Sequence, residues 1–226
     1  MGLKKGIPVI LGFVPVGIAY AIMAHQAGFS AMETVLMSIF VFAGASQMMA
    51  VGMYAQGAGL VAMILATFIL NLRHLIMSTC VMNKMGKEKT GQKLLAAFGV
   101  TDESFAIFTT EEEEKCSIFY FLGLITVTYS SWVAGSAIGA VTSGLLPDIV
   151  TASLGIAIYA MFIGILMPNL KHNLKLGLLV VLTALVNTLL TQFIAYSWAL
   201  IISTLLCAAL GVFFVGEQVK EAADHE

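Results

Sequence analysis

The stretch LVAMILATFILNLRHLIMSTCVM, residues 60–82, decides the fold of this chain. It is apolar almost throughout, and it is long enough for an α-helix to cross a bilayer, which takes about 20 residues. An amide, a guanidinium and an imidazole nevertheless lie near its middle, at Asn71, Arg73 and His74. Ionisable groups at that depth usually face the interior of a bundle or a wet cavity, and they mark the path of a substrate or an ion. The stretch therefore predicts a membrane helix in a protein that moves something polar across the bilayer.

The composition supports a membrane protein and excludes several other classes. Hydrophobic residues make up 59% of the 226 positions and charged residues 11%, whereas a soluble domain carries roughly 25% charged residues. A chain so poor in charge needs the lipid bilayer as its solvent. The net charge of −2 leaves no basic surface to neutralise phosphates, so we expect no nucleic-acid partner.

The sequence also lacks the common signatures of cofactor, metal and enzyme sites. Cys80, Cys116 and Cys207 lie far apart and show no CxxC spacing, which argues against a disulfide framework and a zinc site. No GxxxxGK[ST] phosphate loop and no HExxH, GxSxG or SxxK set occurs. We therefore expect no cofactor, no metal and no enzymatic activity, and this chain does not hydrolyse ATP by itself.

Apolar runs of about 18 to 25 residues, which is enough to span a membrane, occur seven times. They are Ile7–His25, Met32–Met53, Gly59–Met82, Ser117–Val141, Ile149–Met167, Leu174–Thr191 and Ala195–Val215. The expected fold is therefore all-α: a polytopic membrane helix bundle of about seven transmembrane helices. Within a single membrane domain, 1–226, we expect a first helical repeat at 1–83 and a central polar interval with a short helix at 84–116. A second repeat at 117–191 and a last helix with a cytoplasmic tail at 192–226 would follow.

The distribution of lysines predicts how the chain is oriented. With seven single crossings and an outside amino terminus, eight lysines are cytoplasmic and only Lys4 and Lys5 lie on the wrong side. The opposite orientation reverses these numbers and conflicts with the positive-inside rule. A third arrangement keeps the amino terminus inside and lets one amino-terminal segment re-enter, or lets Leu94–Thr110 cross. The misplaced Lys4 and Lys5 keep this third arrangement open.

The two halves of the chain share weak similarities. Phe42-Ala43-Gly44 in the second span resembles Phe162-Ile163-Gly164 in the fifth, and the third and sixth spans each hold one asparagine, Asn71 and Asn187. Because each repeat has an odd number of spans, the two would be inverted relative to one another. Inverted repeats with broken helices are a common plan of transporters, with the substrate site near the midplane.

The motif Phe42-Ala43-Gly44-Ala45-Ser46-Gln47 interrupts the second span with small and polar residues. A helix break at Gly44 would present backbone N–H groups, Ser46 and the Gln47 amide to an anionic group such as a carboxylate. The alternative is close helix packing through the small residues, with Gln47 bonded across an interface. Breaks or kinks are also expected at Pro8 and Pro15 in the first span and at Pro168, although Pro168 can simply end its helix.

The charged candidates lie in the third span and in the central interval. Arg73 offers a planar fork that matches two carboxylate oxygens. Snorkelling to the headgroups is the alternative, but the end of the apolar run is roughly 13 Å away at 1.5 Å per residue, so an internal partner is favoured. His74 can titrate in a proton-coupled cycle or be a hydrogen-bonded structural histidine. Asp102 and Glu103 are candidates for proton coupling or gating, or they mark an ordinary helix start capped by Thr101 or Asp102.

Taken in order, these motifs resemble the AzlC family over nearly the whole chain. They are Pro8 with Pro15-Val16-Gly17, Phe42-Ala43-Gly44-Ala45-Ser46-Gln47, Asn71-Leu72-Arg73-His74 and Thr101-Asp102-Glu103. The resemblance implies the large subunit of a bacterial branched-chain amino acid exporter in the cytoplasmic (inner) membrane. It further implies export of valine, leucine, isoleucine and often methionine, together with a small membrane subunit of the AzlD family. The energy source would be the proton gradient or the membrane potential.

On this basis the substrate-binding residues are expected to be Ser46, Gln47, Asn71 and Arg73. The coupling or gating residues are expected to be His74, Asp102 and Glu103. The alternative is a scaffold or channel-like membrane subunit, whose small partner or a separate ATPase carries the transport path.

Overall fold

The computed structural model describes residues 2–85, 88–112, 116–145 and 174–223, with isolated positions at 149, 163, 167 and 170. The chain divides into two compact units. The first comprises Met1–Ala55 and Leu70–Tyr159, and the second comprises Gln56–Ile69 and Ala160–Glu226.

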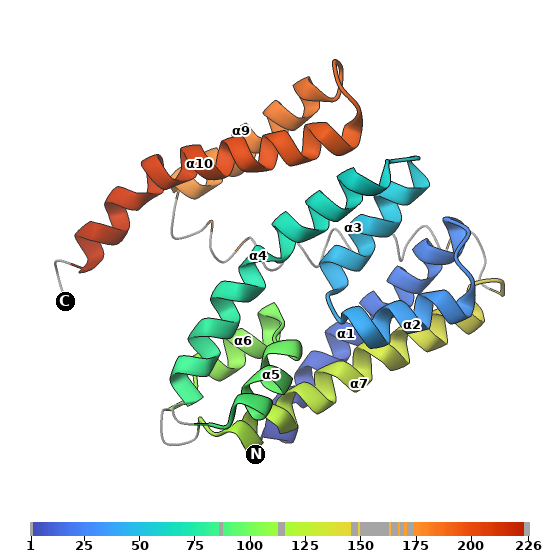
Figure 1. The fold of residues 1–226 in the computed structure, drawn as a ribbon, viewed down its shortest axis with the longest axis vertical. Coiled ribbons are helices and arrows are strands. Elements are labelled where there is room, and N and C mark those ends of the chain that lie inside the picture. Colours follow the sequence, from blue (N-terminus) through green and yellow to red (C-terminus); the bar gives the residue numbers. More distant parts are fainter. Residues whose placement is uncertain are drawn as a thin grey trace. The chain divides into compact units, whose positions relative to one another are not determined.

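Every regular element in the described residues is a helix, so the prediction of an all-α membrane helix bundle is confirmed (Figure 1). The helices are α1 (Gly2–Gln26), α2 (Ala31–Val41), α3 (Gly44–Ala55), α4 (Leu60–Met85), α5 (Thr90–Phe98), α6 (Asp102–Thr109), α7 (Ile118–Thr142), α9 (Leu174–Leu190) and α10 (Tyr196–Ala223). Within the described ranges, three of them are long and apolar enough to cross a membrane, namely α1, α4 and α7. The others are shorter or less apolar, which changes how the predicted spans must be interpreted.

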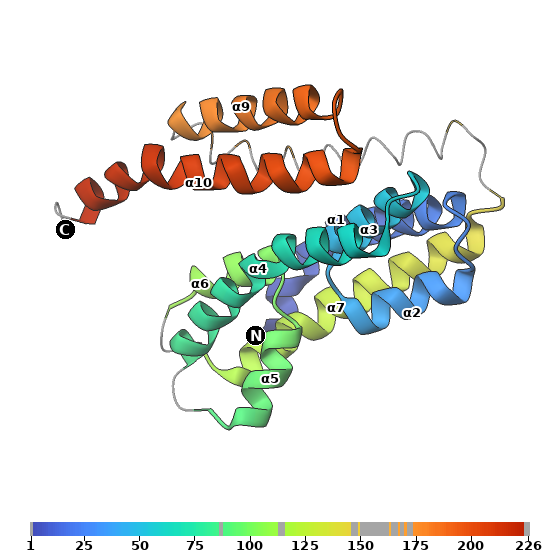
Figure 2. The same ribbon diagram turned by 45° about the horizontal axis from the view of Figure 1, so that its top comes forward.

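Helices α1 and α7 run in parallel, side by side, and form the frame of the first unit (Figure 2). Glycines let their backbones approach closely, as is common where membrane helices pack. A Cβ atom added to Gly2 would lie 1.9 Å from the Tyr120 carbonyl oxygen, and one added to Gly17 would lie 3.1 Å from the Ser136 nitrogen. Since the start of α1 meets the start of α7 and its middle meets the middle, both helices point the same way.

The sequence predicted that the apolar run Met32–Met53 crosses the membrane as a single span. The structure contradicts this prediction. The run forms α2 and α3, which are separated at Phe42, whose backbone has the left-handed φ of 41°, and α3 begins at Gly44. The rings of Phe29, just before α2, and Tyr54, near the end of α3, pack with centroids 5.0 Å apart. Both ends of this pair therefore lie at the same end of the unit, and we call α2–α3 the outer hairpin.

The length of the outer hairpin helices explains why neither of them spans. Helices of 11 and 12 residues reach roughly 17 Å at 1.5 Å per residue, about half of the ~30 Å hydrocarbon core. The start of α2 is fixed by a capping box: the Ser30 hydroxyl accepts a hydrogen bond from the Glu33 N–H, and the Glu33 carboxylate accepts one from the Ser30 N–H.

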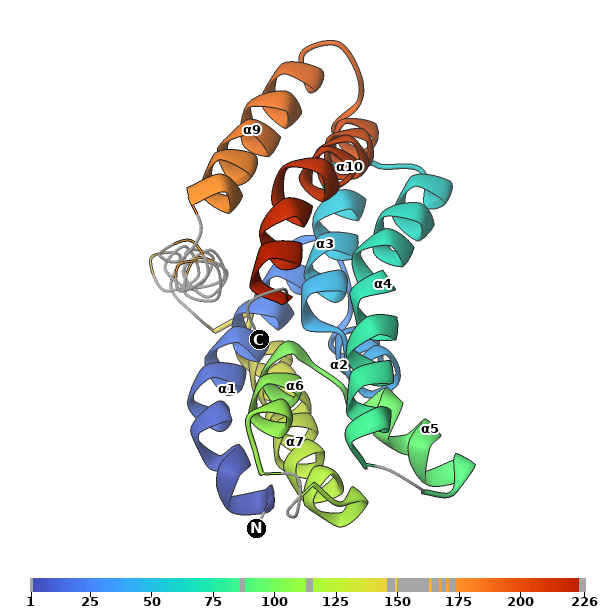
Figure 3. The same cartoon turned by 90° about the vertical axis from the view of Figure 1, so that its left-hand side faces the viewer.

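A second hairpin, α5–α6, enters from the opposite end and packs beside α4 and the start of α7 (Figure 3). Its base is held by the Lys84 ammonium, which donates to the carbonyl oxygens of Thr109 and Glu111 at 2.6 Å each. Its tip reaches the middle of α4, where Asp102 pairs with Arg73. The segment Leu94–Thr110 therefore enters and returns instead of crossing, and we call α5–α6 the inner hairpin.

Of the two arrangements that the sequence left open, the contacts of Lys5 and Lys84 fit the one with a re-entrant amino-terminal segment and do not fit seven single crossings. That arrangement places Lys5 and Lys84 on opposite sides of the membrane. In the structure, Lys5 lies 3.3 Å from the Glu111 carboxylate, and Lys84 binds the Glu111 carbonyl. The two lysines thus share one end of the first unit, and by the positive-inside rule we expect this end to face the cytoplasm. The re-entrant outer hairpin removes the conflict that Lys4 and Lys5 had caused.

A core of buried side chains fills the cytoplasmic half of the first unit. It joins the second part of α4, both helices of the inner hairpin and the start of α7. Its members are Met77, Val81, Met85, Ala96, Val100, Phe108, Cys116, Ile118, Tyr120, Phe121, Leu124 and Ile125. Gly99 completes this contact, because a Cβ there would lie 2.5 Å from the Ile125 Cδ1.

The prolines do not interrupt the first helix. Helix α1 is continuous through Pro8 and Pro15, so neither proline ends it; each lacks the N–H that would bond the carbonyl four residues earlier. Pro168, most of Phe162-Ile163-Gly164 and most of the span expected at 149–167 lie outside the described residues.

In the second unit, α9 and α10 pack against each other after a short turn at 191–195. The Ser203 hydroxyl on α10 donates to the Asn187 side-chain oxygen on α9 at 3.3 Å. Asn187, which the sequence singled out as the counterpart of Asn71, therefore makes a polar contact between two apolar helices, as is typical of membrane bundles.

Candidate substrate site at the hairpin tips

The tips of the outer and inner hairpins meet at the middle of α7. The Phe42 ring packs with its centroid 5.0 Å from that of Tyr129, and the Phe98 ring lies 6.0 Å from the Tyr129 ring. Phe42 and Phe98 also face one another, with centroids 6.2 Å apart. Tyr129 lies roughly 16 Å along α7 from Ile118 at 1.5 Å per residue, so both tips stop near the midplane of the membrane.

At the outer tip, Ser46 is held against α4. The Ser46 side chain is 3% exposed, and its hydroxyl donates to the side-chain oxygen of Asn71. Ser46 lies in the first turn of α3, where the N–H groups have no partner within the helix and carry the positive end of the helix dipole. The outer tip therefore presents partial positive charge next to an amide of α4.

At the inner tip, Asp102 is paired with Arg73. The guanidinium Nη1 lies 2.9 Å from the Asp102 Oδ2, and each side chain keeps about a third of its surface exposed. Asp102 is the first residue of α6 and follows the cap residue Thr101, whose hydroxyl accepts from the Ser104 N–H at 3.2 Å. The cap and the carboxylate both suit the helix start. The internal partner expected for Arg73 is thus Asp102, and snorkelling is not needed to explain its depth.

Arg73 has donor capacity to spare. Its Nε is buried and has no hydrogen-bond partner among the described residues. A guanidinium carries five N–H donors, and a single contact with Asp102 leaves most of them uncommitted. Arg73 therefore has N–H donors available for a second anion.

His74 and Glu103 flank this ion pair. The His74 imidazole lies beside the backbone of Val100 at the inner tip. Glu103 follows Asp102 in the first turn of α6 and is half-buried. Both groups lie close enough to Arg73 and Asp102 to feel the charge of a bound ligand.

Gln47 lies fully buried, and both ends of its amide are engaged. Its Nε2 donates to the Ser38 hydroxyl at 3.1 Å, and its Oε1 accepts from the Trp132 indole N–H at 3.1 Å. Ser38 in turn donates to the Ser136 hydroxyl at 2.7 Å. A direct contact between Gln47 and a substrate, as the sequence led us to expect, would require it to exchange one of these bonds.

Trp132 is the residue that sequence reasoning missed. Besides its bond to Gln47, its ring stacks on Tyr20 at 5.9 Å and meets the Phe13 ring edge-on at 5.8 Å. A Cβ at Gly44 would lie 2.6 Å from the Trp132 ring. The only signal in the sequence was a tryptophan beside serines and glycines in an apolar helix, a pattern that is common in membrane helices.

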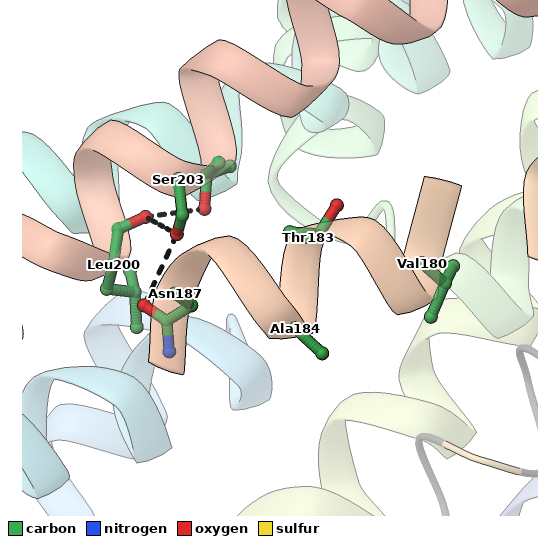
Figure 4. Close-up of a pocket in the computed structure, with 7 residues that line it drawn as sticks. Val180, Thr183, Ala184, Asn187, Leu200 and Ser203 are labelled. Carbon is green, nitrogen blue, oxygen red and sulfur yellow. Dashed lines mark hydrogen bonds between the residues drawn. The ribbon is translucent and has the colours of Figure 1, made fainter. Parts of the chain in front are cut away.

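The second unit holds a separate shallow groove of about 380 Å³ between α9 and α10 (Figure 4). It is lined by Val180, Thr183, Ala184, Asn187, Leu200, Ser203 and Thr204. In the close-up, the Ser203 hydroxyl points toward the Asn187 side-chain oxygen and donates a hydrogen bond to it. The groove carries no ionisable side chain, and no cluster of three metal-ligating groups occurs in the described ranges.

Comparison with known proteins places this arrangement in a family. The family model described as "AzlC protein" matches residues 8–146, which include α2 to α7 and both hairpin tips. The chain belongs to the AzlC family. Every site residue named above from Gly44 to Glu103 lies within the matched segment, so the hairpins are part of what defines this AzlC-family chain.

Several relatives are membrane proteins. An uncharacterized membrane protein of Archaeoglobus fulgidus is 36% identical over 172 residues, 75% of each chain. Inner membrane protein YgaZ of Escherichia coli is 32% identical over 185 residues, 77% of this chain and 74% of the relative. The branched-chain amino acid transport protein AzlC of Bacillus subtilis is 34% identical over 166 residues, 68% of this chain and 63% of the relative. No solved structure matches this AzlC-family chain.

Proposed function

We propose that this AzlC-family protein is the large subunit of a two-component secondary exporter of branched-chain amino acids. Its substrates are valine, leucine and isoleucine, with methionine as a further candidate, and they move out of the bacterial cytoplasm. The observation that carries the proposal is the Arg73–Asp102 pair at the midplane, beside the helix start of α3. The name of the Bacillus subtilis relative, a branched-chain amino acid transport protein, supports the substrate class.

The site has the two charges that a zwitterion requires. The substrate carboxylate binds Arg73, because a guanidinium matches two carboxyl oxygens, and the N–H groups at the start of α3 near Ser46 add partial positive charge. The substrate ammonium binds Asp102, and the Asn71 amide completes the polar contacts. Gln47 acts by holding the outer hairpin on α7 through Trp132, and its bond to Ser38 joins α3 to α2 within the hairpin.

The aliphatic side chain of the substrate lies on the apolar side of this site. Discrimination among valine, leucine, isoleucine and methionine is expected to be modest, because one methylene in an apolar pocket is worth only about 1–3 kcal/mol. Glu103, next to the ion pair, is the group through which a proton gradient can be coupled to transport, and His74 has a structural role at the inner tip. The partner subunit in this proposal is a small membrane protein of the AzlD family.

The test is efflux of radiolabelled valine from cells that carry this chain, with and without the small partner. We expect efflux only with both chains, and we expect it to stop when the proton gradient and membrane potential are collapsed. Efflux that survives collapse but ends with ATP depletion would point to an unseen ATPase. Arg73→Ala should abolish efflux while the chain still binds its partner. If Arg73→Ala transports normally, the chain is a scaffold and the path lies in the small subunit.

A further inference from the structure

The same succession of helices occurs twice between Gly2 and Thr109. A helix long enough to span, α1, is followed by a hairpin that goes half way and returns, α2–α3. A second long helix, α4, is followed by a second such hairpin, α5–α6. The outer hairpin starts where α1 ends, and the inner hairpin starts where α4 ends. Because α4 reaches the cytoplasmic end at Lys84, the two hairpins enter the membrane from opposite sides.

The tips also correspond in sequence. Phe98 lies 56 positions after Phe42, and Asp102 lies 56 positions after Ser46. Phe42 directly follows α2, and Phe98 is the last residue of α5. The two rings pack on each other and on Tyr129. Ser46 and Asp102 both lie in the first turn of the returning helix, and both bond α4, at Asn71 and Arg73.

We propose that the two hairpins are the two gates of the transporter, the outer hairpin on the external side and the inner hairpin on the cytoplasmic side. This rests on the proposed function, and it replaces a repeat of three whole spans by a repeat of one span and one hairpin. α1 and α7 form the fixed frame against which each hairpin moves. The substrate lies where the tips meet.

The contacts that hold each hairpin explain how a substrate releases it. The inner tip is held to α4 by the Arg73–Asp102 pair. A zwitterion that binds both side chains replaces this pair, because its carboxylate binds Arg73 and its ammonium binds Asp102. The outer tip is held to α4 by Ser46 and Asn71, which a bound carboxylate can engage instead. A ligand shifts a conformational equilibrium only if it binds one state better, and here it replaces the bonds of the closed state.

The remaining contacts of the outer hairpin are of a kind that can open and re-form. Besides the packing of Phe42 on Tyr129, three hydrogen-bonded contacts hold it on α7: Ser38–Ser136, Gln47–Trp132 and the Tyr129 hydroxyl, which donates to the Ile39 carbonyl at 2.9 Å. That carbonyl belongs to the last turn of α2, which the break leaves without helical donors. Phe42 has a φ of 41°, a conformation that is strained in residues other than glycine and is common where segments switch.

The experiment uses disulfides that close one gate at a time. The chain, with its small partner, first has Cys80, Cys116 and Cys207 replaced by alanine. Ser38→Cys with Ser136→Cys joins the outer hairpin to α7, since the two hydroxyl oxygens lie 2.7 Å apart. Gly99→Cys with Ile125→Cys joins the inner hairpin to α7, since a Cβ at position 99 would lie 2.8 Å from the Ile125 Cβ.

A matched control joins α1 to α7 within the frame. Gly6→Cys with Val127→Cys brings two Cβ atoms within 3.0 Å. We expect either gate disulfide alone to reduce valine efflux at least tenfold, with recovery on reduction, and the frame disulfide to leave efflux unchanged.

The outcomes separate this inference from the proposed function. If the reduced variants move no valine although they are folded with their partner, the proposed function fails. If they move valine and both gate disulfides form without slowing efflux, the hairpins are static and the gate inference is overturned. Should the tight Gly99→Cys position fail to fold, the outer pair still decides the question for its own gate.

Discussion

At the residue scale, the pairing of Arg73 with Asp102 governs both folding and binding. Removing one partner leaves a charge without its counter-ion at the midplane, where such charges are strongly disfavoured. Arg73→Ala or Asp102→Ala alone is therefore expected to lower both the yield of folded protein and valine efflux. The double variant Arg73→Ala/Asp102→Ala should recover the yield but not the efflux. Folded yield by size-exclusion chromatography and efflux from cells measure the two effects separately. A double variant that transports normally would show that the pair is only structural.

Glu103 belongs to the same scale, since it adjoins Asp102 and lies near Arg73 at the inner tip. If a proton moves through Glu103 during the cycle, Glu103→Gln should uncouple efflux from the pH gradient while the carboxylate-binding Arg73 is untouched. We expect the dependence of valine efflux on an imposed pH difference to disappear in proteoliposomes. His74→Gln is the matched comparison, and it should keep the dependence. Retention of coupling in Glu103→Gln would assign the proton path to another group or the driving force to the membrane potential.

The bond between Trp132 and Gln47 is expected to stabilise the outer hairpin. Trp132→Phe removes the indole donor and leaves the Gln47 oxygen buried without it, which costs about 1–3 kcal/mol. Gln47→Ala removes the same bond from the other side. Since both changes delete one interaction, their effects on thermal stability in detergent should not add in the double variant. Additive losses would mean that the two side chains stabilise the fold independently.

At the scale of the element, the outer hairpin depends on the close approach of Gly44 to Trp132. Gly44→Ala places a Cβ 2.6 Å from the indole ring, so the tip or the ring must shift. We expect Gly44→Ala to reduce valine efflux several-fold and to lower the melting temperature. Gly52→Ala, in the same helix, is the control, because a Cβ there meets no atom within 4 Å. Equal effects of the two substitutions would show that helix propensity, and not the contact with Trp132, is responsible.

The hairpins are also where the structure differs most from the fold predicted from the sequence. The polar residues Ser46, Asn71, Arg73 and Asp102 could be predicted as a site because each is unusual in an apolar setting, and the structure brings them together in two pairs. The run Met32–Met53 could not be divided with certainty, because two half-helices and one whole span have the same composition and total length. The small residues after Phe42 marked the break, and the misplaced Lys4 and Lys5 marked its effect on topology. Trp132 could not be predicted, since its partners come from two other helices, α1 and α3.

At the scale of the whole first unit, the hairpins determine which segments face which side of the membrane. Single cysteines at Gln26 and Ala55, the ends of α1 and α3, should both react with a membrane-impermeant thiol reagent added to intact cells. A cysteine at Lys89, just before α5, should react only after the cells are opened. An arrangement of seven single crossings predicts instead that Gln26 and Ala55 lie on opposite sides. Labelling of only one of these two positions from outside would therefore support the arrangement of seven single crossings.

The glycine-lined contact between α1 and α7 has a consequence for how the protein is made. About 90 residues separate the end of α1 from the start of α7, and at 5–20 residues per second a ribosome needs roughly 5 to 20 s to produce them. During that time the first helix to enter the membrane has no partner for the face that carries Gly2, Gly6 and Gly17. The outer hairpin also packs on α7, so it lacks these contacts until α7 has been synthesised. The packing of α1 on α7 therefore forms late, after α1 has already entered the membrane. Substitutions along this face should reduce the amount of assembled protein more than the activity of each assembled molecule.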